Sequence, residues 1–442
     1  MLERLFKLKE NRTNVRTEII AGITTFMTMA YIIFVQPAVL SIVGMDFGAV
    51  MMATCISAAL ATLLMGLYAN YPIALAPAMG ENFFYVYTVV LTMGIPWQVA
   101  LGAVFLSGVA FFILTLFKIR ELIIDAVPRS LKNAIAVGIG FFITFIGLVN
   151  AGIIVKNPGG GIVKLGNIRS IPVLLAAFGI LLTVILMIRK VKGAILIGIV
   201  VTAIIGLPLG IVKYQGFVSA PPSLAPTFMK MDILGAIDLG LVTVVTVFLF
   251  MAVFDAIGTL IGIGEQGGFL VNGRLPRANK ALMSDALGTV VGSALGTSTV
   301  TAYIESAAGV EEGGRTGLAN VITGFLFILA IFFSPLVKMI GGGYQIDGSI
   351  LFPITSPALI IVGCMMAKNI TKIAWDDLTE AFPAFLTIIG MPLTYSIADG
   401  LAFGFISYPL LKALSGKFRE VSWLVYLLGA IFLLRYALIA LG

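Results

Sequence analysis

Three carboxylates lie inside long apolar stretches of this sequence of 442 residues. Glu81 stands beside Asn82 in "PAMGENFFYVY", Asp255 lies within "FMAVFDAIGTLIGIGEQGG", and Glu305 falls in "GTSTVTAYIES". A carboxylate is costly in apolar surroundings, so its presence there indicates a function. It can accept hydrogen bonds from a ligand or hold a proton that travels with that ligand. Because the sequence contains no histidine, Glu81, Asp255 and Glu305 are the candidates for coupling a proton.

The composition indicates that this chain lies in a lipid bilayer. Of all residues, 60% are hydrophobic and only 11% are charged, and the mean hydropathy is +1.09. Apolar runs of about 20 residues, long enough to cross a membrane, recur along the whole chain. The net charge of +7 comes from Lys and Arg at the ends of these runs, so we interpret it as orientation bias and expect no nucleic-acid partner. The sequence therefore predicts a multi-pass protein of the cell membrane.

Lys and Arg cluster in every second connection between the predicted spans, at residues 7–16, 118–132, 189–192, 274–280 and 368–372. Connections that carry an excess of positive charge remain in the cytoplasm. We therefore expect the N-terminus to be cytoplasmic.

The sequence offers little for an enzyme or a metal site. Its two cysteines, Cys55 and Cys364, lie far apart in apolar runs, which gives no support for a disulfide. An intramembrane enzyme would need a nucleophile with its base or a metal-binding cluster, and the sequence has neither signature. We therefore expect no enzymatic activity, no catalytic residue, no metal and no cofactor except a coupling ion.

Two of the predicted spans, the third and the tenth, must begin with extended backbone. Pro72 and Pro77 precede Glu81 and cannot donate backbone hydrogen bonds, which argues against an unbroken helix. In the tenth span three β-branched threonines occupy alternate positions before the acid, a pattern that favours a strand. Extended backbone within a membrane needs partners for its polar groups, so the two segments could pair with each other. We expect a short extended segment before a half-helix in each span.

The two halves of the chain also show signs of a repeat. The segment "SAALATLL" at 57–64 aligns with "SDALGTVV" at 284–291, matching Ser, Ala, Leu and Thr. A few residues further on, Glu81 is placed against Glu305 after a short gap. Two buried carboxylates at corresponding positions support the repeat more than the short match alone does.

The longest connection that contains proline, at 212–237, divides the chain after seven predicted spans. An odd number of spans before the break inverts the second repeat, an arrangement by which many transporters alternate access. We therefore expect an all-α polytopic membrane protein of about 14 transmembrane spans in two inverted seven-span repeats, at 1–211 and 238–442.

The paired half-helices suit a neutral ligand better than an anion. Bare helix N-termini attract anions, but Glu81 and Glu305 offset their positive ends. A planar molecule with several N–H donors fits carboxylate and amide groups, and aromatic side chains could cover its faces. Taken singly, either Glu could instead only cap its helix, and Asp255 could bond Ser or Thr groups of a neighbouring helix. The candidate substrate-binding residues are Glu81, Asn82, Phe84, Asp255, Tyr303 and Glu305.

Two further expectations concern the surroundings of Asp255. Gly258, Gly262 and Gly264 recur along its helix and predict close packing against another helix. Glu265 and Asp285 lie nearer the cytoplasmic boundary, and we interpret them as interfacial or loop-ordering residues.

Four longer motifs run through the chain: "TEIIAGITTFMTMAYIIFVQP" at 17–37, "APAMGENFFY" at 76–85, "FDAIGTLIG" at 254–262 and "GTSTVTAYIESAAGV" at 296–310. They resemble, in order and over nearly the whole chain, those of the AzgA-like purine permeases, a branch of the nucleobase–ascorbate transporter superfamily. The resemblance implies a core domain (spans 1–4 and 8–11) that moves against a gate domain (spans 5–7 and 12–14). It also implies uptake of adenine, guanine or hypoxanthine coupled to protons. Asn82, Asp255 and Glu305 match family positions held to bind substrate or couple ions, and Tyr303 matches more loosely.

The chain departs from the family pattern in two ways. Many relatives read "GLN" where this chain has Gly80, Glu81 and Asn82. They also carry an additional acid one helical turn before Asp255, where this chain has Ala252. One acid has been lost from one wall of the site and another gained on the facing half-helix, which bears on the choice of nucleobase more than on the class of function.

We predict a secondary active transporter that imports a purine nucleobase by proton symport with alternating access, as a monomer or a homodimer. A transporter of another neutral heterocycle, such as uracil or xanthine, is one alternative. An anion transporter or channel of the same fold is the other, and Na⁺ in place of H⁺ is open as the coupling ion.

Overall fold

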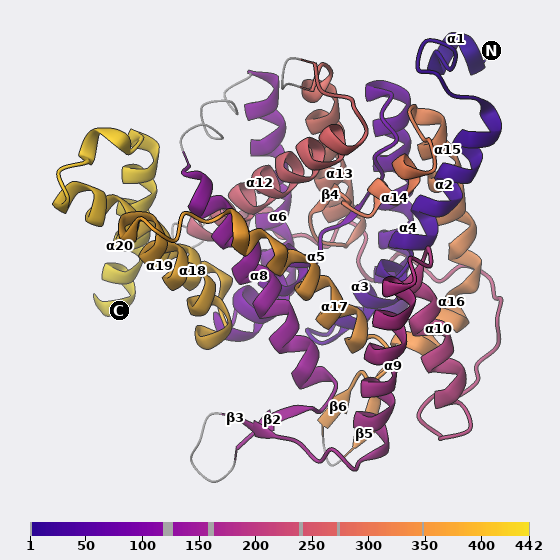
Figure 1. Cartoon of the computed structure of the whole chain (residues 1–442). Helices are drawn as coiled ribbons and strands as arrows, with labels where there is room; N and C mark the ends of the chain where they lie inside the picture. The colour runs from indigo at the N-terminus through magenta and orange to yellow at the C-terminus, as the bar shows by residue number, and fades with distance from the viewer. Residues whose placement is uncertain are drawn as a thin grey trace.

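The computed structural model describes residues 2–117, 127–157, 163–237, 242–271, 275–346 and 349–441. Helices dominate, and each sheet among these residues has only two short strands (Figure 1). Eight helices in the described part of the chain are long and apolar enough to cross a membrane, and three shorter apolar helices accompany them. The prediction of an all-helical polytopic membrane protein is confirmed. Of the clusters used to predict orientation, residues 118–126 and residue 274 lie outside the described residues.

In the first half of the chain, side-chain caps begin two of the helices. Asn14 accepts a hydrogen bond from the N–H of Thr17, and Asp46 accepts one from the N–H of Ala49. The elements are α1 (Leu2–Phe6), α2 (Val15–Met29), α3 (Ile32–Ser41), α4 (Phe47–Leu64), η1 (Met65–Ala69), β1 (Leu75–Pro77), α5 (Met79–Phe83), η2 (Phe84–Thr92), α6 (Trp97–Leu116), α8 (Arg129–Asn150), β2 (Ile154–Lys156), β3 (Val163–Leu165), α9 (Ile171–Ile188) and α10 (Ala194–Gly206).

The second half begins beyond an extended connection that carries α11 (Ile233–Ala236). Its capped helices start at Thr316, Asp377 and Ser396, whose side chains each accept a backbone N–H. The elements are α12 (Val242–Gln266), α13 (Ala278–Leu295), β4 (Val300–Ala302), α14 (Ser306–Glu311), α15 (Gly317–Ala330), η4 (Ile331–Phe333), α16 (Ser334–Gly341), β5 (Tyr344–Ile346), β6 (Ser349–Leu351), α17 (Ser356–Ala367), η5 (Lys368–Lys372), α18 (Leu378–Thr394), α19 (Ile397–Leu414), η6 (Phe418–Glu420) and α20 (Trp423–Leu441).

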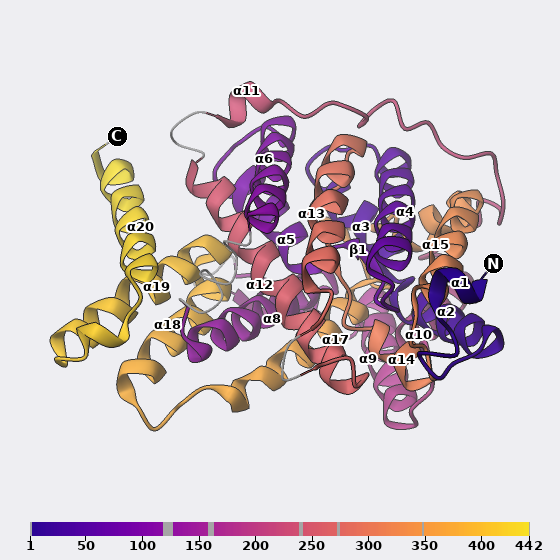
Figure 2. The same cartoon turned by 90° about the horizontal axis from the view of Figure 1, so that it is seen from above.

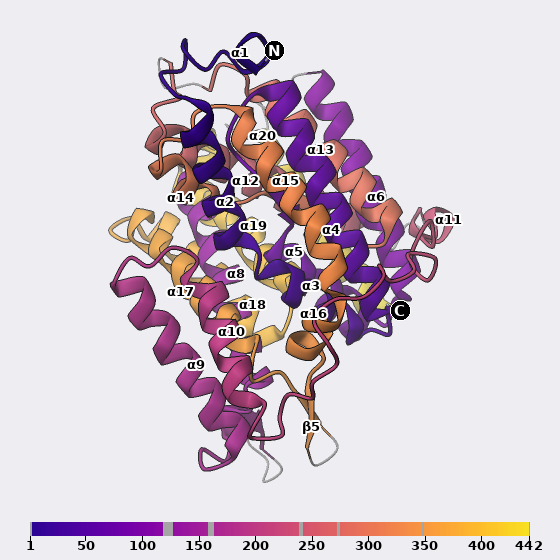
Figure 3. The ribbon, with the colours of Figure 1, turned by 90° about the vertical axis from the view of Figure 1, so that its right-hand side faces the viewer.

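The helices pack in two groups that mix both halves of the chain. In one group α15 packs on α2 and α4, and α13 packs on α4, α6 and β4. In the other, α8 packs on α17 and α18, α18 packs on α19, and α9 packs on α10 and α17. Figure 2 shows α18, α19 and α20 at one side of the molecule and α2 and α15 at the other, and Figure 3 shows α9 beside α10 below them. We call the group that contains α2, α4, α6, α13 and α15 the first helix group, and the group that contains α8, α9, α10, α17, α18 and α19 the second helix group.

Two strands from opposite halves of the chain meet in the first group. β1 and β4 are antiparallel, with Leu75 opposite Ala302 and Pro77 opposite Val300, and all six residues are buried. Short helical turns follow directly, α5 after β1 and α14 after β4. The prediction of extended segments before short helices is confirmed, and the pairing satisfies backbone groups that lipid could not.

Equivalent threonines hold the two strands. The hydroxyl of Thr62 on α4 donates to the carbonyl of Leu75 and accepts its N–H, both at 2.9 Å. The hydroxyl of Thr289 on α13 does the same for Val300, at 2.9 and 3.1 Å. These two threonines are matched in the alignment of 57–64 with 284–291, so the short sequence match has a structural basis.

Candidate functional site

The three acids gather around the crossing of β1 and β4. Glu81 lies in the first turn of α5, Glu305 immediately precedes α14, and Asp255 lies on α12, which packs against β4. Asp255 is close enough to Glu81 and to Glu305 to interact with both electrostatically. The crossing therefore brings together carboxylates that are up to 224 positions apart in the sequence.

Glu81 has an oxygen with nothing to bind. Its side chain is 2% exposed, and Oε1 finds no hydrogen-bond partner in the described part of the chain. An unsatisfied buried carboxylate oxygen carries its full desolvation cost, so it indicates a missing ligand or a proton. Ala78, at the N-cap of α5, contributes no side-chain cap either. Capping therefore gives no account of this Oε1 atom.

Glu305 is held from the other side of the crossing. The hydroxyl of Tyr31, between α2 and α3, donates to its Oε1 at 2.7 Å, and Thr28 donates to its backbone carbonyl at 3.2 Å. Glu305 makes no side-chain cap for α14 in the described structure. As a residue, Glu305 is half-buried.

The carboxamide of Asn82 belongs to a closed polar ring. It donates to Gln36 Oε1 and accepts from the hydroxyl of Ser298, and both contacts are short. Gln36 in turn donates to Thr297 at 2.8 Å and to Ser298 at 3.2 Å. The ring ties α3 and α5 to the segment before β4. The sequence analysis missed Gln36, although an amide before Pro37 in the apolar segment "FVQP" was the available signal.

The two predicted aromatic residues differ in their surroundings. Tyr303 is 4% exposed, its hydroxyl donates to the carbonyl of Pro77, and its ring lies 6.4 Å from that of Tyr31. Phe84 is fully buried with its ring edge-on to Phe248 of α12 at 4.8 Å. Tyr303 therefore lies at the strand crossing, whereas Phe84 packs α5 and η2 against α12.

Asp285 is not an interfacial residue, so that alternative of its prediction was wrong, whereas an ordering role fits its contacts. Its side chain is fully buried on α13, and its Oδ2 accepts from the N–H of Ala302 at 2.9 Å and from the hydroxyl of Thr301 at 3.1 Å. α13 packs beside β4, so Asp285 lies at this strand and not at the expected boundary of the membrane. Asp285 therefore orders the strand that delivers Tyr303 and Glu305. Glu265, by contrast, is exposed.

The expected close packing at Gly258 was also wrong. A side-chain carbon added at Gly258 would meet nothing within 4 Å, and one at Gly262 would meet only Ile304 at an ordinary 3.7 Å. Asp255, one turn earlier on the same helix, is exposed in the same direction. Here glycine leaves open space beside the acid instead of admitting another helix.

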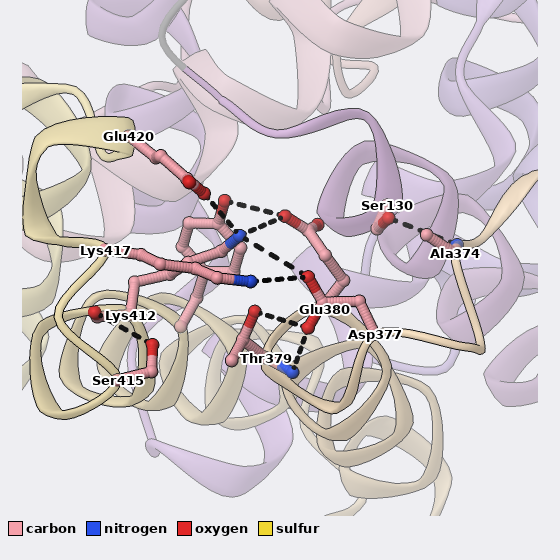
Figure 4. A network of polar contacts seen from close by, with 10 residues as sticks. Ser130, Ala374, Asp377, Thr379, Glu380, Lys412, Ser415, Lys417 and Glu420 are labelled. Carbon is pink, nitrogen blue, oxygen red and sulfur yellow. Dashed lines mark hydrogen bonds and ion pairs between the residues drawn. The ribbon is translucent and has the colours of Figure 1, made fainter.

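A second cluster of acids, not predicted from the sequence, lies in the second helix group (Figure 4). Lys412 of α19 is 3% exposed, and its Nζ lies 3.0 Å from Glu380, 3.0 Å from Glu420 and 3.9 Å from Asp377. Lys417 also contacts Asp377, at 3.4 Å. Tyr408 donates to Glu380 at 3.0 Å, so every carboxylate of this cluster has a partner.

This second cluster borders a cavity of about 420 Å³. Arg129 and Ser130 at the start of α8 also line it. Hydrogen bonds from the hydroxyl and N–H of Thr379 lower the pKa of Asp377 to about 2. The carboxylates that line this cavity are already bonded to cations or hydroxyls, so we do not assign substrate binding to it.

The fold and the unpaired acids at a strand crossing define a membrane transporter. Residues 16–403 match the Permease family, so the chain belongs to that family and is a transporter rather than an enzyme. It is 46% identical to the adenine permease AdeP of Escherichia coli over 440 residues, which cover 99% of this chain and 96% of AdeP. It is 45% identical to the guanine/hypoxanthine permease PbuG of Bacillus subtilis over 447 residues, 98% of this chain and 99% of PbuG. The family predicted from the four motifs is confirmed.

Solved structures share the fold at low sequence identity. The transmembrane domain of the cyanobacterium bicarbonate transporter BicA aligns with a TM-score of 0.62 at 15% identity, covering 88% of this chain and 96% of that domain. SLC26A9 aligns with a TM-score of 0.61 at 10% identity, covering 91% of this chain and 66% of that one. The architecture of this chain is therefore that of known transporters.

Proposed function

We propose that this protein is a purine nucleobase permease of the cell membrane. The observation that carries the proposal is the set of acids at the β1–β4 crossing, of which Glu81 keeps a buried oxygen without a partner. Adenine, guanine and hypoxanthine are planar and present N–H groups along their edges, which carboxylates can accept. Full-length relatives named as adenine and as guanine/hypoxanthine permeases support the same substrate class.

Within this proposal the six predicted residues have different roles. Glu81, Asp255 and Glu305 accept hydrogen bonds from the base, and Tyr303 lies against it. Asn82 and Phe84 hold the binding residues in place, because their side chains are engaged by Gln36, Ser298 and Phe248. Uracil or xanthine would use the same acceptors, so they remain competing substrates. An anion is disfavoured because the three gathered side chains are themselves acids.

The proposed mechanism moves the first helix group against the second. The first group corresponds to the predicted core domain and the second to the gate domain. The paired strands and the matching bonds of Thr62 and Thr289 support two inverted repeats of seven spans. In this scheme α19 is the fourteenth span, and α20 is an additional apolar helix. The N-terminus and the C-terminal end of α12 face the cytoplasm.

Protons are the proposed coupling ion. No histidine is present, so the transported proton must reside on a carboxylate, and Asp255, Glu305 and Glu81 are the candidates. Acids gathered in one site repel one another when ionised, which favours holding one proton among them.

Uptake into proteoliposomes tests substrate and ion together. Radiolabelled adenine, guanine and hypoxanthine would be compared with uracil, xanthine, sulfate and bicarbonate under an imposed H⁺ or Na⁺ gradient. We expect purine uptake that is driven by an inward proton gradient and stopped by a protonophore. Uptake of sulfate or bicarbonate with no purine uptake would overturn the substrate assignment. Purine uptake that follows only the Na⁺ gradient would overturn the proton assignment alone.

A further inference from the structure

One face of α12 changes from buried to exposed at Asp255. On the N-terminal side of the acid, Val244 is 3% exposed, Phe248 0% and Met251 3%. On the C-terminal side, the residues at the same helical spacing are more open: Gly258 and Glu265 are exposed, and Gly262 is half-buried. A helix that is simply covered or simply lipid-facing would show one environment along its whole length. The level of Asp255 therefore marks a boundary between a closed and an open part of the molecule.

The open part also includes α14 and the two residues before it. Ile304 is 45% exposed, Glu305 and Ala308 are half-buried, and Glu311 is exposed. At the far end, Gln266 of α12 donates to Glu311 at 2.6 Å. The acids along this surface, Asp255, Glu305 and Glu311, argue against contact with lipid, because ionisable groups in lipid are costly. The two helices are in contact along this stretch, and we call the exposed surface that they share the vestibule.

The closed part contains a cluster of aromatic rings from both helix groups. Tyr87 of η2, which packs on α6 of the first group, lies 5.6 Å from Tyr395 and 6.4 Å from Phe142, ring centre to ring centre, at steep angles. Tyr395 also meets Phe142 and Phe145 of α8, both at 5.8 Å. Phe83 stacks on Tyr87 at 5.8 Å and continues the cluster to α5, beside Glu81. We call Tyr87, Phe142, Phe145 and Tyr395 the aromatic seal.

The position of Tyr395 depends on an unusual backbone. It ends α18 in the left-handed region, with φ +58°, which turns the chain sharply into α19. A non-glycine residue rarely adopts this conformation, and here it delivers the ring among three others. Edge-on ring contacts are specific in geometry but individually weak, so a surface built of them can part and re-form.

We propose that the aromatic seal is the gate on the side of the site opposite the vestibule, and that the structure is the state open at the vestibule end. The inference rests on the proposed transport function and adds the residues that close one route. In the proposed orientation the vestibule opens to the cytoplasm and the seal faces outward. Transport then requires Tyr87 to separate from Tyr395 and Phe142 as the first helix group moves against the second.

Cysteine labelling tests this directly. In a background of Cys55→Ala and Cys364→Ser, single variants Gly258→Cys and Met251→Cys place thiols on one helical face, on either side of the boundary. We expect a membrane-impermeant maleimide to label Gly258→Cys from the vestibule side only and to leave Met251→Cys unlabelled from both sides. Equal labelling of the two thiols from one side would overturn the proposal.

The second experiment weakens the aromatic seal by removing one of its rings. Adding Tyr395→Ala should raise labelling of Met251→Cys from the outer side about tenfold, as expected when several ring contacts are lost, and should lower labelling of Gly258→Cys. Phe145→Ala removes only one ring and should act in the same direction, and it serves if Tyr395→Ala does not fold. Tyr214→Ala, at an exposed tyrosine in the connection, is the matched control and should change neither rate. Unchanged labelling in both seal variants would overturn the proposal.

The same thiols separate this inference from the proposed function. Hypoxanthine or adenine should protect Gly258→Cys from labelling if the acids bind a purine. Asymmetric labelling without protection by any purine would contradict the substrate and leave the seal standing. Protection of Gly258→Cys by a purine without asymmetric labelling of the two thiols would support the substrate and contradict the seal.

Discussion

In the described part of the molecule, two clusters of carboxylates differ in how the desolvation cost of their charges is offset. In the second helix group, Asp377, Glu380 and Glu420 surround Lys412, and each acid has a cation or hydroxyl within bonding distance. At the strand crossing, Glu81 and Glu305 share their site with a third acid, and in the described part of the chain the carboxylate of Glu305 is bonded by the hydroxyl of Tyr31 and by no cation.

The difference separates acids that hold the fold from acids that await a ligand. A buried lysine surrounded by carboxylates is fixed, because removing either sign leaves uncompensated charge. Acids without a cation are stable only with a proton or a bound donor, and both can leave. Burial alone therefore does not identify a functional acid.

The largest effect is expected at the cation of the paired cluster. Lys412→Met should lower the free energy of unfolding by about 3 kcal/mol, at the low end for a broken buried ion pair because Glu420 is half-exposed. Thermal unfolding in detergent would measure it. Lys417→Met, which removes an exposed lysine from Asp377, is the matched control and should have little effect. A Lys412→Met protein as stable as wild type would erase the contrast between the clusters.

At the unpaired cluster we expect loss of transport without loss of stability. Glu305→Gln should reduce purine uptake by about 10- to 150-fold, the result of losing a charge-assisted hydrogen bond of about 1.5–3 kcal/mol. Its unfolding temperature and its amount in the membrane should stay close to those of the wild type. Glu10→Gln, at an exposed acid near the N-terminus, is the control. Wild-type kinetics in Glu305→Gln would remove this acid from the site.

The exchange of acids between two walls predicts a non-additive pair. Glu81→Leu should impair uptake severely, because the site loses a carboxylate that no other residue replaces. Ala252→Asp alone should also be harmful, since Ala252 is 2% exposed and another acid there adds repulsion. The double variant should transport better than either single one. Uptake normalised to membrane content decides this, and normal transport by Glu81→Leu would reduce Glu81 to a helix-start residue.

The smallest effect concerns the rim of the paired cluster. The pKa of Asp377 is lowered to about 2 by hydrogen bonds from Thr379, so its contribution to stability is present above the ordinary pKa of about 4. That contribution should disappear as the pH falls through the folded pKa. Asp377→Asn should therefore differ slightly from wild type at neutral pH, and the two should converge near pH 2. A difference that grows on acidification would show that another group is responsible.

Much of the site was visible in the sequence because it depended on local signals. Pro72, Pro77 and alternating threonines predict extended backbone, and acids in apolar runs predict function, so the strand crossing and its three acids follow from residue types. The Thr62 and Thr289 match indicated which segments correspond.

Other features depend on contacts that no local pattern encodes. The pairing of Lys412 with Glu380 arises between two helices, and nothing in either helix predicts the other. Asp285 was assigned to the boundary by its position in the chain, whereas the inward course of α13 decides its burial. Gly258 shows the same limit, since small residues suit both close packing and open space, and only the neighbours decide between them.

The pairing of β1 with β4 also sets an order of events in biosynthesis. About 225 residues separate the two strands, so a ribosome working at 5–20 residues per second makes β4 roughly 10 to 45 seconds after β1. Throughout that interval the backbone of Leu75–Pro77 has no strand to bond. The first half of the chain must therefore enter the membrane with an unfinished centre, and the transport site is completed only when the newly made second half docks on it.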